Sequence, residues 1–228
     1  MKRFAAAAVC IFFFATYVSA QKISAEVGVS MMSVDAMNRE LNTLGSLPLS
    51  NSFTSFGLRL NVRHSSNYAV DVVYRLSANS NNAEGSLGLK KLTFGFQTIG
   101  LEFSTFRQTL GKITIDPILG MHLLWANLNI TDVPIDTTSL QAIFTNSQTS
   151  KHIGLSRMLG AMALGARISR EFSWFGKTME MGLHPFFVFE FPGSVTDSKW
   201  RSGTQQVNGL DGLNLRHFSV MGSLSVTL

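Results

Sequence analysis

The sequence predicts an all-β protein, an eight-stranded antiparallel up-and-down transmembrane β-barrel. Eight stretches of the chain alternate apolar and polar residues with a period of two, as strands do when one face lies in an apolar medium. The connections between these stretches alternate between long and short, as in membrane barrels with an even number of strands. The last stretch, 216–228, stays apolar on one side with no polar tail. Pairing it with the first strand would remove an open, aggregation-prone edge.

The first 20 residues have the features of a secretory signal peptide. A basic pair precedes an apolar run from Phe4 to Ala15, and Val18-x-Ala20 suits the cleavage rule. This run is too short for a membrane-spanning helix, which needs about 20 apolar residues. We therefore expect a signal peptide over 1–20 and a single barrel domain over 21–228.

Composition excludes several classes of function. The only cysteine, Cys10, lies inside the signal peptide, so the mature chain has no disulfide, no thiol nucleophile and no cysteine metal site. Without Lys2 and Arg3, 17 basic residues face 14 acidic ones, which gives a net charge near +3. That charge is too mild to indicate nucleic acid as a partner. Charged residues make up only 14% of the chain, which suits strands that face lipid.

The first three strands have the clearest alternation. A loop of small and polar residues, Asp35–Ser52, separates the first two, and the short turn His64–Asn67 separates the second from the third. The residues that we expect to face lipid are Ile23, Ala25, Val27, Val29 and Met31, then Phe56, Leu58, Leu60 and Val62, then Tyr68, Val70, Val72, Tyr74 and Leu76.

The fourth strand follows a predicted polar loop, Ala78–Lys90, and its apolar phase changes midway. The apolar set is first Leu92, Phe94 and Phe96 and then Ile99, Leu101 and Phe103. If both sets face lipid, one extra residue near Thr98 must switch the register, which is what a β-bulge does. A break between two shorter strands is the alternative.

The last four strands are less regular. They are predicted over Ile113–Trp125, Met158–Ile168, Met179–Phe191 and 216–228. Pro117 weakens the first of these because it lacks a backbone donor, and Arg167 suggests that odd-numbered residues of the next one point inward. The connections are short turns at Gln108–Lys112 and Arg170–Lys177 and long polar loops at Thr131–Ser156 and Pro192–Asn214.

With this pattern the chain resembles the small eight-stranded outer-membrane β-barrel families, such as the OmpA/OmpX-type and PorT-like barrels. The resemblance covers the whole mature chain and rests on strand count and loop alternation. Many such barrels end in Phe with a glycine at a fixed earlier place, whereas this chain ends in Leu228 and has Gly222 one position off that spacing. The resemblance implies a bacterial outer-membrane location. It also implies contact with outer-membrane lipid and lipopolysaccharide, assembly by the barrel assembly machinery with periplasmic chaperones, and an envelope protein as a further partner.

Charged residues on the polar faces of the strands form the candidate site. An eight-stranded barrel is wide enough only for its own side chains, and buried charges must pair. We therefore expect a packed network of acids and bases, with a narrow channel as the alternative if the strand number is larger. The predicted members of this lumen network are Glu26, Arg59, Arg63, Asp71, Arg75, Glu102, Asp116, Arg167, Glu180 and Glu190.

Three histidines also fall on inward positions of the predicted strands: His122, His184 and His217. Neutral imidazole is a common metal ligand, but nothing in their spacing fixes a common height in the barrel. We expect these histidines to join the polar network, and we predict neither a metal site nor a cofactor.

A short motif, His64-x-Ser66-Asn67, is the one candidate for catalysis. It resembles the His-x-Ser-Asn signature of outer-membrane lipid A deacylases, in which the histidine would be the base and the serine the nucleophile. Here the motif falls in a predicted short turn, where serine and asparagine are ordinary residues.

The sequence thus predicts a non-enzymatic envelope protein: a membrane anchor, a surface-contact protein or a subunit of an envelope or secretion assembly. The two last long loops, with the apolar residues Phe144 and Trp200 expected to be exposed, are candidates for surface contact. The alternatives are a lipid A deacylase-like hydrolase and a soluble lipocalin-like barrel whose apolar faces surround a ligand.

Overall fold

The structure, a computed structural model, describes most of the chain beyond the predicted signal peptide. The described residues are 22–43, 48–64, 68–85, 88–132, 152–191, 200–202, 205–206 and 214–228. The predicted signal peptide (1–20) and much of the loops Thr131–Ser156 and Pro192–Asn214 lie outside these ranges.

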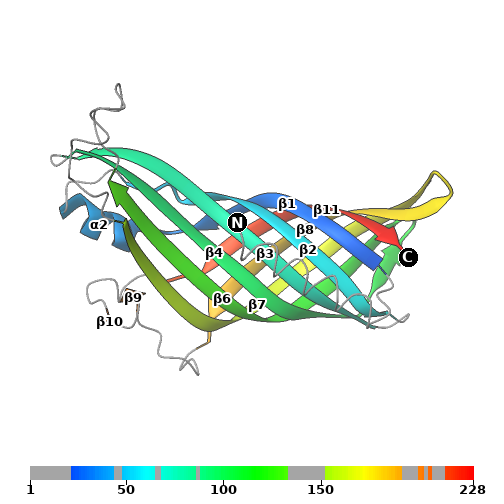
Figure 1. Ribbon diagram of the computed structural model, residues 1–228. Coiled ribbons are helices and arrows are strands. Elements are labelled where there is room, and N and C mark those ends of the chain that lie inside the picture. The colour runs from blue at the N-terminus through cyan, green and yellow to red at the C-terminus, as the bar shows by residue number, and fades with distance from the viewer. Residues whose placement is uncertain are drawn as a thin grey trace.

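Eight antiparallel strands close into one barrel (Figure 1). In order around the wall they are β1 (Lys22–Met32), β2 (Ser52–His64), β3 (Tyr68–Gly85), β4 (Gly88–Thr105), β6 (Ile113–Asp132), β7 (His152–Trp174), β8 (Lys177–Glu190) and β11 (His217–Thr227). β11 pairs with β1 along its whole length, from Lys22 opposite Thr227 to Met32 opposite His217. The predicted fold class and the predicted closure are therefore confirmed.

Shorter elements distinguish the two ends of the barrel. The helix α2 (Asp35–Thr43) and the strands β9 (Arg201–Ser202) and β10 (Gln205–Gln206) lie at one end, which we call the loop end (Figure 1). The small strand β5 (Gln108–Leu110) and the C-terminus lie at the other, which we call the turn end. Among the described residues, no helix is long and apolar enough to cross a membrane.

Several predicted connections are shorter than expected because the strands run on. β3 continues to Gly85 and β4 begins at Gly88, so most of the predicted loop Ala78–Lys90 is a regular hairpin. β7 extends to Trp174, and the turn predicted over Arg170–Lys177 shrinks to Phe175 and Gly176, with φ of 47° and 71°. Two positive φ values in a two-residue loop match the right-handed twist of the hairpin strands.

The predicted loop Asp35–Ser52 contains the helix α2, which the period-two pattern does not reveal. Asn38 of the helix binds the returning chain at both backbone atoms of Leu49: its Oδ1 accepts from the Leu49 nitrogen at 2.7 Å, and its Nδ2 donates to the Leu49 oxygen at 3.0 Å. This clamp holds α2 against the loop end, where Met37 is fully buried.

The prediction of a bulge or a break near Thr98 is wrong. β4 pairs with β3 and with β6 without any shift of register, and its even-numbered residues from Leu92 to Ser104 face the lumen. Leu92, Phe94 and Phe96, expected to face lipid, are buried inside the barrel. The register shift that the described strands do show lies on β2, between Asn61 and Arg63.

The two faces of the wall exchange character at the level of Thr98. Toward the turn end, β4 and β6 carry large apolar residues on the outer face and polar ones inside. Toward the loop end the order is reversed. There the outer residues are Thr93, Gly95, Gln97, Asn127 and Asn129, and the inner ones are Leu92, Phe94, Phe96, Leu124 and Leu128. The apparent change of phase therefore reflects a change of surroundings along one continuous strand.

Apolar side chains fill the lumen near the loop end. Phe53 packs against Phe94 and Phe96 with ring centroids 5.6 and 5.5 Å apart, and Phe94 lies 6.3 Å from Trp200. Trp200, expected to be an exposed contact residue, is fully buried, because Arg201 pairs with β7 and draws this segment over the barrel. Together with Met37 it closes the lumen at this end.

Phe94 should contribute more to stability than any aromatic residue at the turn end. We expect Phe94→Ala to lower the free energy of unfolding by about 3–5 kcal/mol, because it leaves a cavity between packed rings. Urea unfolding of the refolded protein in detergent micelles measures this. Phe175→Ala is the control, since Phe175 is 88% exposed, and equal losses in the two variants would contradict the packing described here.

Candidate functional site: the polar network of the lumen

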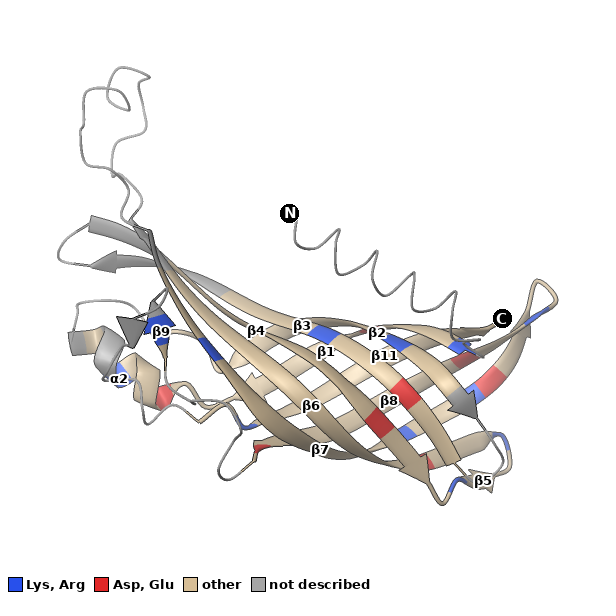
Figure 2. Cartoon of the chain, turned by 60° about the horizontal axis from the view of Figure 1, so that its bottom comes forward, with Lys and Arg blue, Asp and Glu red and all other residues tan. Residues whose placement is uncertain are grey.

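The charged residues of the strands gather in the half of the barrel toward the turn end (Figure 2). Eight of the ten predicted residues are buried there: Glu26, Arg59, Asp71, Arg75, Glu102, Asp116, Arg167 and Glu180. Glu190 lies instead near the loop end, where it pairs with Arg157 at 3.2 Å and accepts from the Leu215 nitrogen at 2.6 Å. The side chain of Arg63 is not among the described ones, and the register shift beside it ends the alternation that predicted its facing.

Arg59 is the centre of the network. Its guanidinium lies 2.8 Å from Glu26 on β1, 3.0 Å from Asp71 on β3 and 3.0 Å from Glu102 on β4. The side chain is only 1% exposed, so these carboxylates take the place of water around the cation. Because a guanidinium presents five donors in a planar fork, one arginine can serve carboxylates on three strands.

Arg75 forms a second bridge between the same carboxylates. It donates to Glu26 at 2.7 Å and to Glu102 at 2.5 Å, and its guanidinium carbon lies 4.4 Å from the centroid of the Phe186 ring. Gly57 makes room for this arrangement, since a Cβ there would lie 3.0 Å from both the Arg75 side chain and the Glu26 carboxylate. Glu26 and Glu102 are thus each held by both arginines.

A second group of ion pairs lies closer to the turn end. Arg167 contacts Asp71 at 3.0 Å and Asp116 at 3.4 Å, and Arg107 contacts Asp116 at 3.1 Å. Lys22 contacts Glu180 at 2.6 Å. Asp71 joins Arg167, and through it Asp116 and Arg107, to Arg59, so these charges form one connected set across the lumen.

Sequence reasoning missed Lys22 and Arg107. Lys22 could have been found, because it shares the even-numbered face of β1 with Ser24 and Glu26. Arg107 carries no such signal, since it lies past the end of β4. It reaches the lumen because the preceding residue, Phe106, adopts a φ of 64° and turns the chain. This left-handed conformation is costly for a non-glycine residue.

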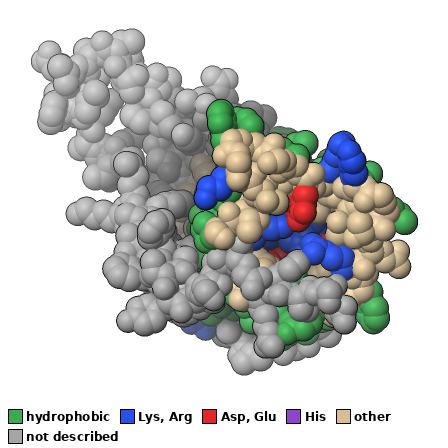
Figure 3. All heavy atoms as spheres, turned by 90° about the vertical axis from the view of Figure 1, so that its right-hand side faces the viewer, with side chains coloured by type: hydrophobic (Ala, Val, Ile, Leu, Met, Phe, Trp, Pro, Cys, Tyr) green, Lys and Arg blue, Asp and Glu red, His purple; other side chains and the backbone are tan. Residues whose placement is uncertain are grey.

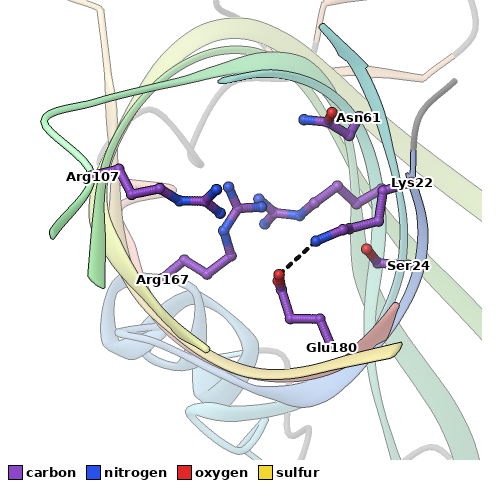
Figure 4. Close-up of a pocket in the computed structure, with 7 residues that line it drawn as sticks. Lys22, Ser24, Asn61, Arg107, Arg167 and Glu180 are labelled. Atoms are coloured by element: carbon purple, nitrogen blue, oxygen red, sulfur yellow. Dashed lines mark hydrogen bonds and ion pairs between the residues drawn. The ribbon is translucent and has the colours of Figure 1, made fainter. Parts of the chain in front are cut away.

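The turn end of the lumen is packed with these side chains. Figure 3 looks onto this end, where basic and acidic side chains lie at the centre and apolar ones toward the periphery. Figure 4 shows Arg107 and Arg167 entering the lumen from the same side, with their guanidinium groups close together near its centre, beside the Lys22–Glu180 pair. Arg59 lines the same partly open space, which has a volume of about 10 Å³ and is enough for about one water molecule.

The charges of the network balance. Its acids are Glu26, Asp71, Glu102, Asp116 and Glu180, and its bases are Lys22, Arg59, Arg75, Arg107 and Arg167. Five negative and five positive groups leave no net charge in the barrel. Such compensation is what buried charges require, and it gives the lumen little attraction for an ion of either sign.

Serine hydroxyls form the boundary between the polar and apolar halves. Ser30 lies 2.7 Å from both Ser55 and Ser219, and Ser55 lies 2.7 Å from Ser77. Hydroxyl groups can donate and accept at once, so four strands exchange hydrogen bonds here without any charge.

The three inward histidines do not come together. His217 binds the Leu215 oxygen through Nδ1 at 3.0 Å, and its ring lies 4.6 Å from that of Phe96. His122 lies 3.4 Å from Glu102, whereas His184 lies beside Glu26. In the described part of the chain, no group of three or more histidine, cysteine or acidic residues could hold a metal ion.

His184 has the spacing of a serine–histidine–acid relay, but the relay is buried. Its Nδ1 lies 3.0 Å from Glu26 and its Nε2 3.3 Å from the Ser223 hydroxyl. Arg59 lies 2.9 Å from the same Nδ1. The guanidinium can only donate to this nitrogen and the carboxylate can only accept from it, so the two contacts favour opposite tautomers. Ser223 and His184 are both buried in the lumen, where the side chains of the network surround them.

The motif predicted for hydrolysis falls mostly outside the described residues. His64 ends β2, but its side chain is not among those described, and neither are Ser66 and Asn67. The deacylase alternative therefore stays a prediction.

Known proteins share the fold of this chain rather than its sequence. No protein-family model matches it, and no curated protein is similar to it in sequence. A major outer membrane protein from Thermus thermophilus is 10% identical over 90% of this chain and 99% of its own, with a TM-score of 0.50. Neisserial surface protein A is 12% identical over 91% of this chain and 96% of its own, with a TM-score of 0.46. Ail, the attachment invasion locus protein of Yersinia pestis, is 10% identical over 92% of this chain and 99% of its own, with a TM-score of 0.42.

Removing the central arginine should destabilise the barrel strongly. We expect Arg59→Met to lower the free energy of unfolding by about 3–5 kcal/mol, because Glu26, Asp71 and Glu102 lose a shared counter-charge in a buried place. Urea titration in micelles measures the loss. Arg216→Met removes the same charge from an exposed position and should cost less than about 1 kcal/mol. A loss at Arg59 as small as that of the control would contradict the network.

Proposed function

We propose that this chain is a non-enzymatic protein of the bacterial outer membrane that serves the envelope as an anchor, a surface-contact protein or a subunit of a larger assembly. The observation that carries the proposal is the reversal of polarity at the level of Thr98. On the turn-end side of this level β4 and β6 are mostly apolar outside, and on the loop-end side they are mostly polar outside. An apolar outer surface is suited to lipid, and a polar outer surface is suited to water.

The position of this level agrees with the thickness of a membrane. Trp125 lies on the outer face of β6 opposite Gln97, and tryptophan is enriched at membrane surfaces. A transmembrane strand needs about 9–11 residues, and counting that far along β6 from Trp125 reaches the neighbourhood of Ile115, close to the turn end. The turn end would then lie at the periplasmic surface and the loop end outside, as in barrels with short periplasmic turns.

The described lumen supports a structural role rather than transport or catalysis. The network fills the turn end and apolar side chains fill the loop end, which argues against a channel. Apolar residues such as Val27, Phe56, Met181 and Leu224 face outward, which argues against a soluble lipocalin-like barrel. Partners at the loop end, lipopolysaccharide included, and assembly by the barrel assembly machinery with its chaperones are part of the same proposal.

A charge on the proposed lipid face should impair folding into bilayers. We expect Leu224→Arg to cost roughly 2–4 kcal/mol if Leu224 lies near the midplane, because the cation enters hydrocarbon. Leu228→Arg, at the end of the chain, should cost at most about 1 kcal/mol. Folding yield in phospholipid vesicles and flotation with them report both. A protein that stays monomeric and folded without detergent or lipid would overturn the membrane placement.

The filled lumen should not conduct ions. We expect no single-channel steps when the refolded protein inserts into a planar bilayer, because the side chains of the network fill the described part of the lumen and the space that Arg59 lines there holds about one water molecule. A porin in the same bilayer serves as the positive control. Reproducible steps from the purified barrel would favour the channel alternative.

A further inference from the structure

A groove lies on the outer surface of the barrel near the turn end. Two rows of outward side chains cross β7 and β8 there, Ile168 opposite Leu183 and Arg170 opposite Met181. Between the rows, Ser169 and Gly182 pair with each other and present only small groups. The groove is shallow and open to the outside, with a volume of about 380 Å³ and a mostly apolar surface.

Arg170 is the one charged residue that lines this groove. It is exposed on the outer face, and no described residue forms an ion pair or a side-chain hydrogen bond with it. Apolar residues flank it along β7, with Ile168 on one side and Phe172 and Trp174 on the other. A cation in such surroundings needs an anion from outside the chain.

The level of Arg170 in the membrane identifies that anion. Arg170 pairs with Ile113 at the start of β6, about one membrane thickness from Trp125. This level is that of the lipid headgroups, and the planar guanidinium is suited to phosphate. The apolar groove beside it, lined by Leu183 and Ile168, is suited to an acyl chain.

We propose that this groove binds one phospholipid with a net negative headgroup, its phosphate on Arg170 and an acyl chain between the two rows. The proposal rests on the membrane placement proposed above and adds a specific lipid site to it. Phospholipids with a net neutral headgroup should bind more weakly, because their own cation competes with Arg170 for the phosphate.

Intact-protein mass spectrometry tests this on barrels released from detergent micelles doped with phosphatidylglycerol or phosphatidylcholine. We expect the wild type to retain one phosphatidylglycerol about fivefold more tightly than phosphatidylcholine. Arg170→Gln should remove this preference, and Leu183→Trp should weaken both lipids by filling the groove. Two controls should retain the wild-type pattern: Arg216→Gln, which removes a charge at the other end, and Leu119→Trp, which enlarges an outward residue away from the groove.

Vesicle flotation and the gel mobility of the unheated protein, measured on the same samples, report insertion and folding separately. A barrel that inserts but shows no preference, or keeps it in Arg170→Gln, would overturn the lipid site alone. Loss of the preference in Arg216→Gln as well would show a general surface-charge effect and would also overturn the site. A chain that does not insert would overturn the membrane placement and the lipid site together.

Discussion

Compensation of charge inside a closed wall is the constraint on which the barrel depends. Once β11 and β1 are paired, the carboxylates around Arg59 are buried and cannot be hydrated. Strands far apart in sequence must therefore supply their partners. A slip of one residue in any strand would move its inward charges to the outer face. The network therefore specifies the register of the strands as well as filling the lumen. Apolar packing alone would specify that register less strictly.

The apolar half of the lumen has the opposite requirement. Its apolar side chains must be shielded from water, and the strands alone would leave them open to water at the loop end. Met37 of α2 and Trp200 supply that cover, and the Asn38–Leu49 clamp holds the helix in place. The serine ring centred on Ser30 lets the two halves meet without an unpaired charge.

Period-two alternation was sufficient to predict eight strands, their antiparallel order and most of the inward set of charges, because the outer and inner faces differ strongly in polarity along most of the wall. It failed over 92–96, where it assigned apolar residues to the lipid face although the apolar residues of β4 there face the lumen and the outer ones are polar or small. Trp200 and the helix α2 were missed for a related reason. Their burial depends on cover by segments distant in sequence. Arg107 was missed because the direction of its side chain depends on the φ of Phe106. No pattern of residue types predicts that φ.

Two features of the outer face that sequence reading missed define the proposed position of the barrel in a membrane. The reversal beside Thr98 gives one boundary. Arg170, which has no ion-pair partner among the described residues, gives the other, about one transmembrane strand away along the wall. The level of Arg170 is reached by counting along β6 from Trp125, so the two boundaries belong to one proposed placement. In that placement the charged half of the lumen lies within the membrane and the apolar half above it. In this placement the polarity of each half of the lumen is opposite to that of the medium outside the wall. Charges are paired inside where lipid would lie outside, and apolar side chains are packed inside where water would lie outside.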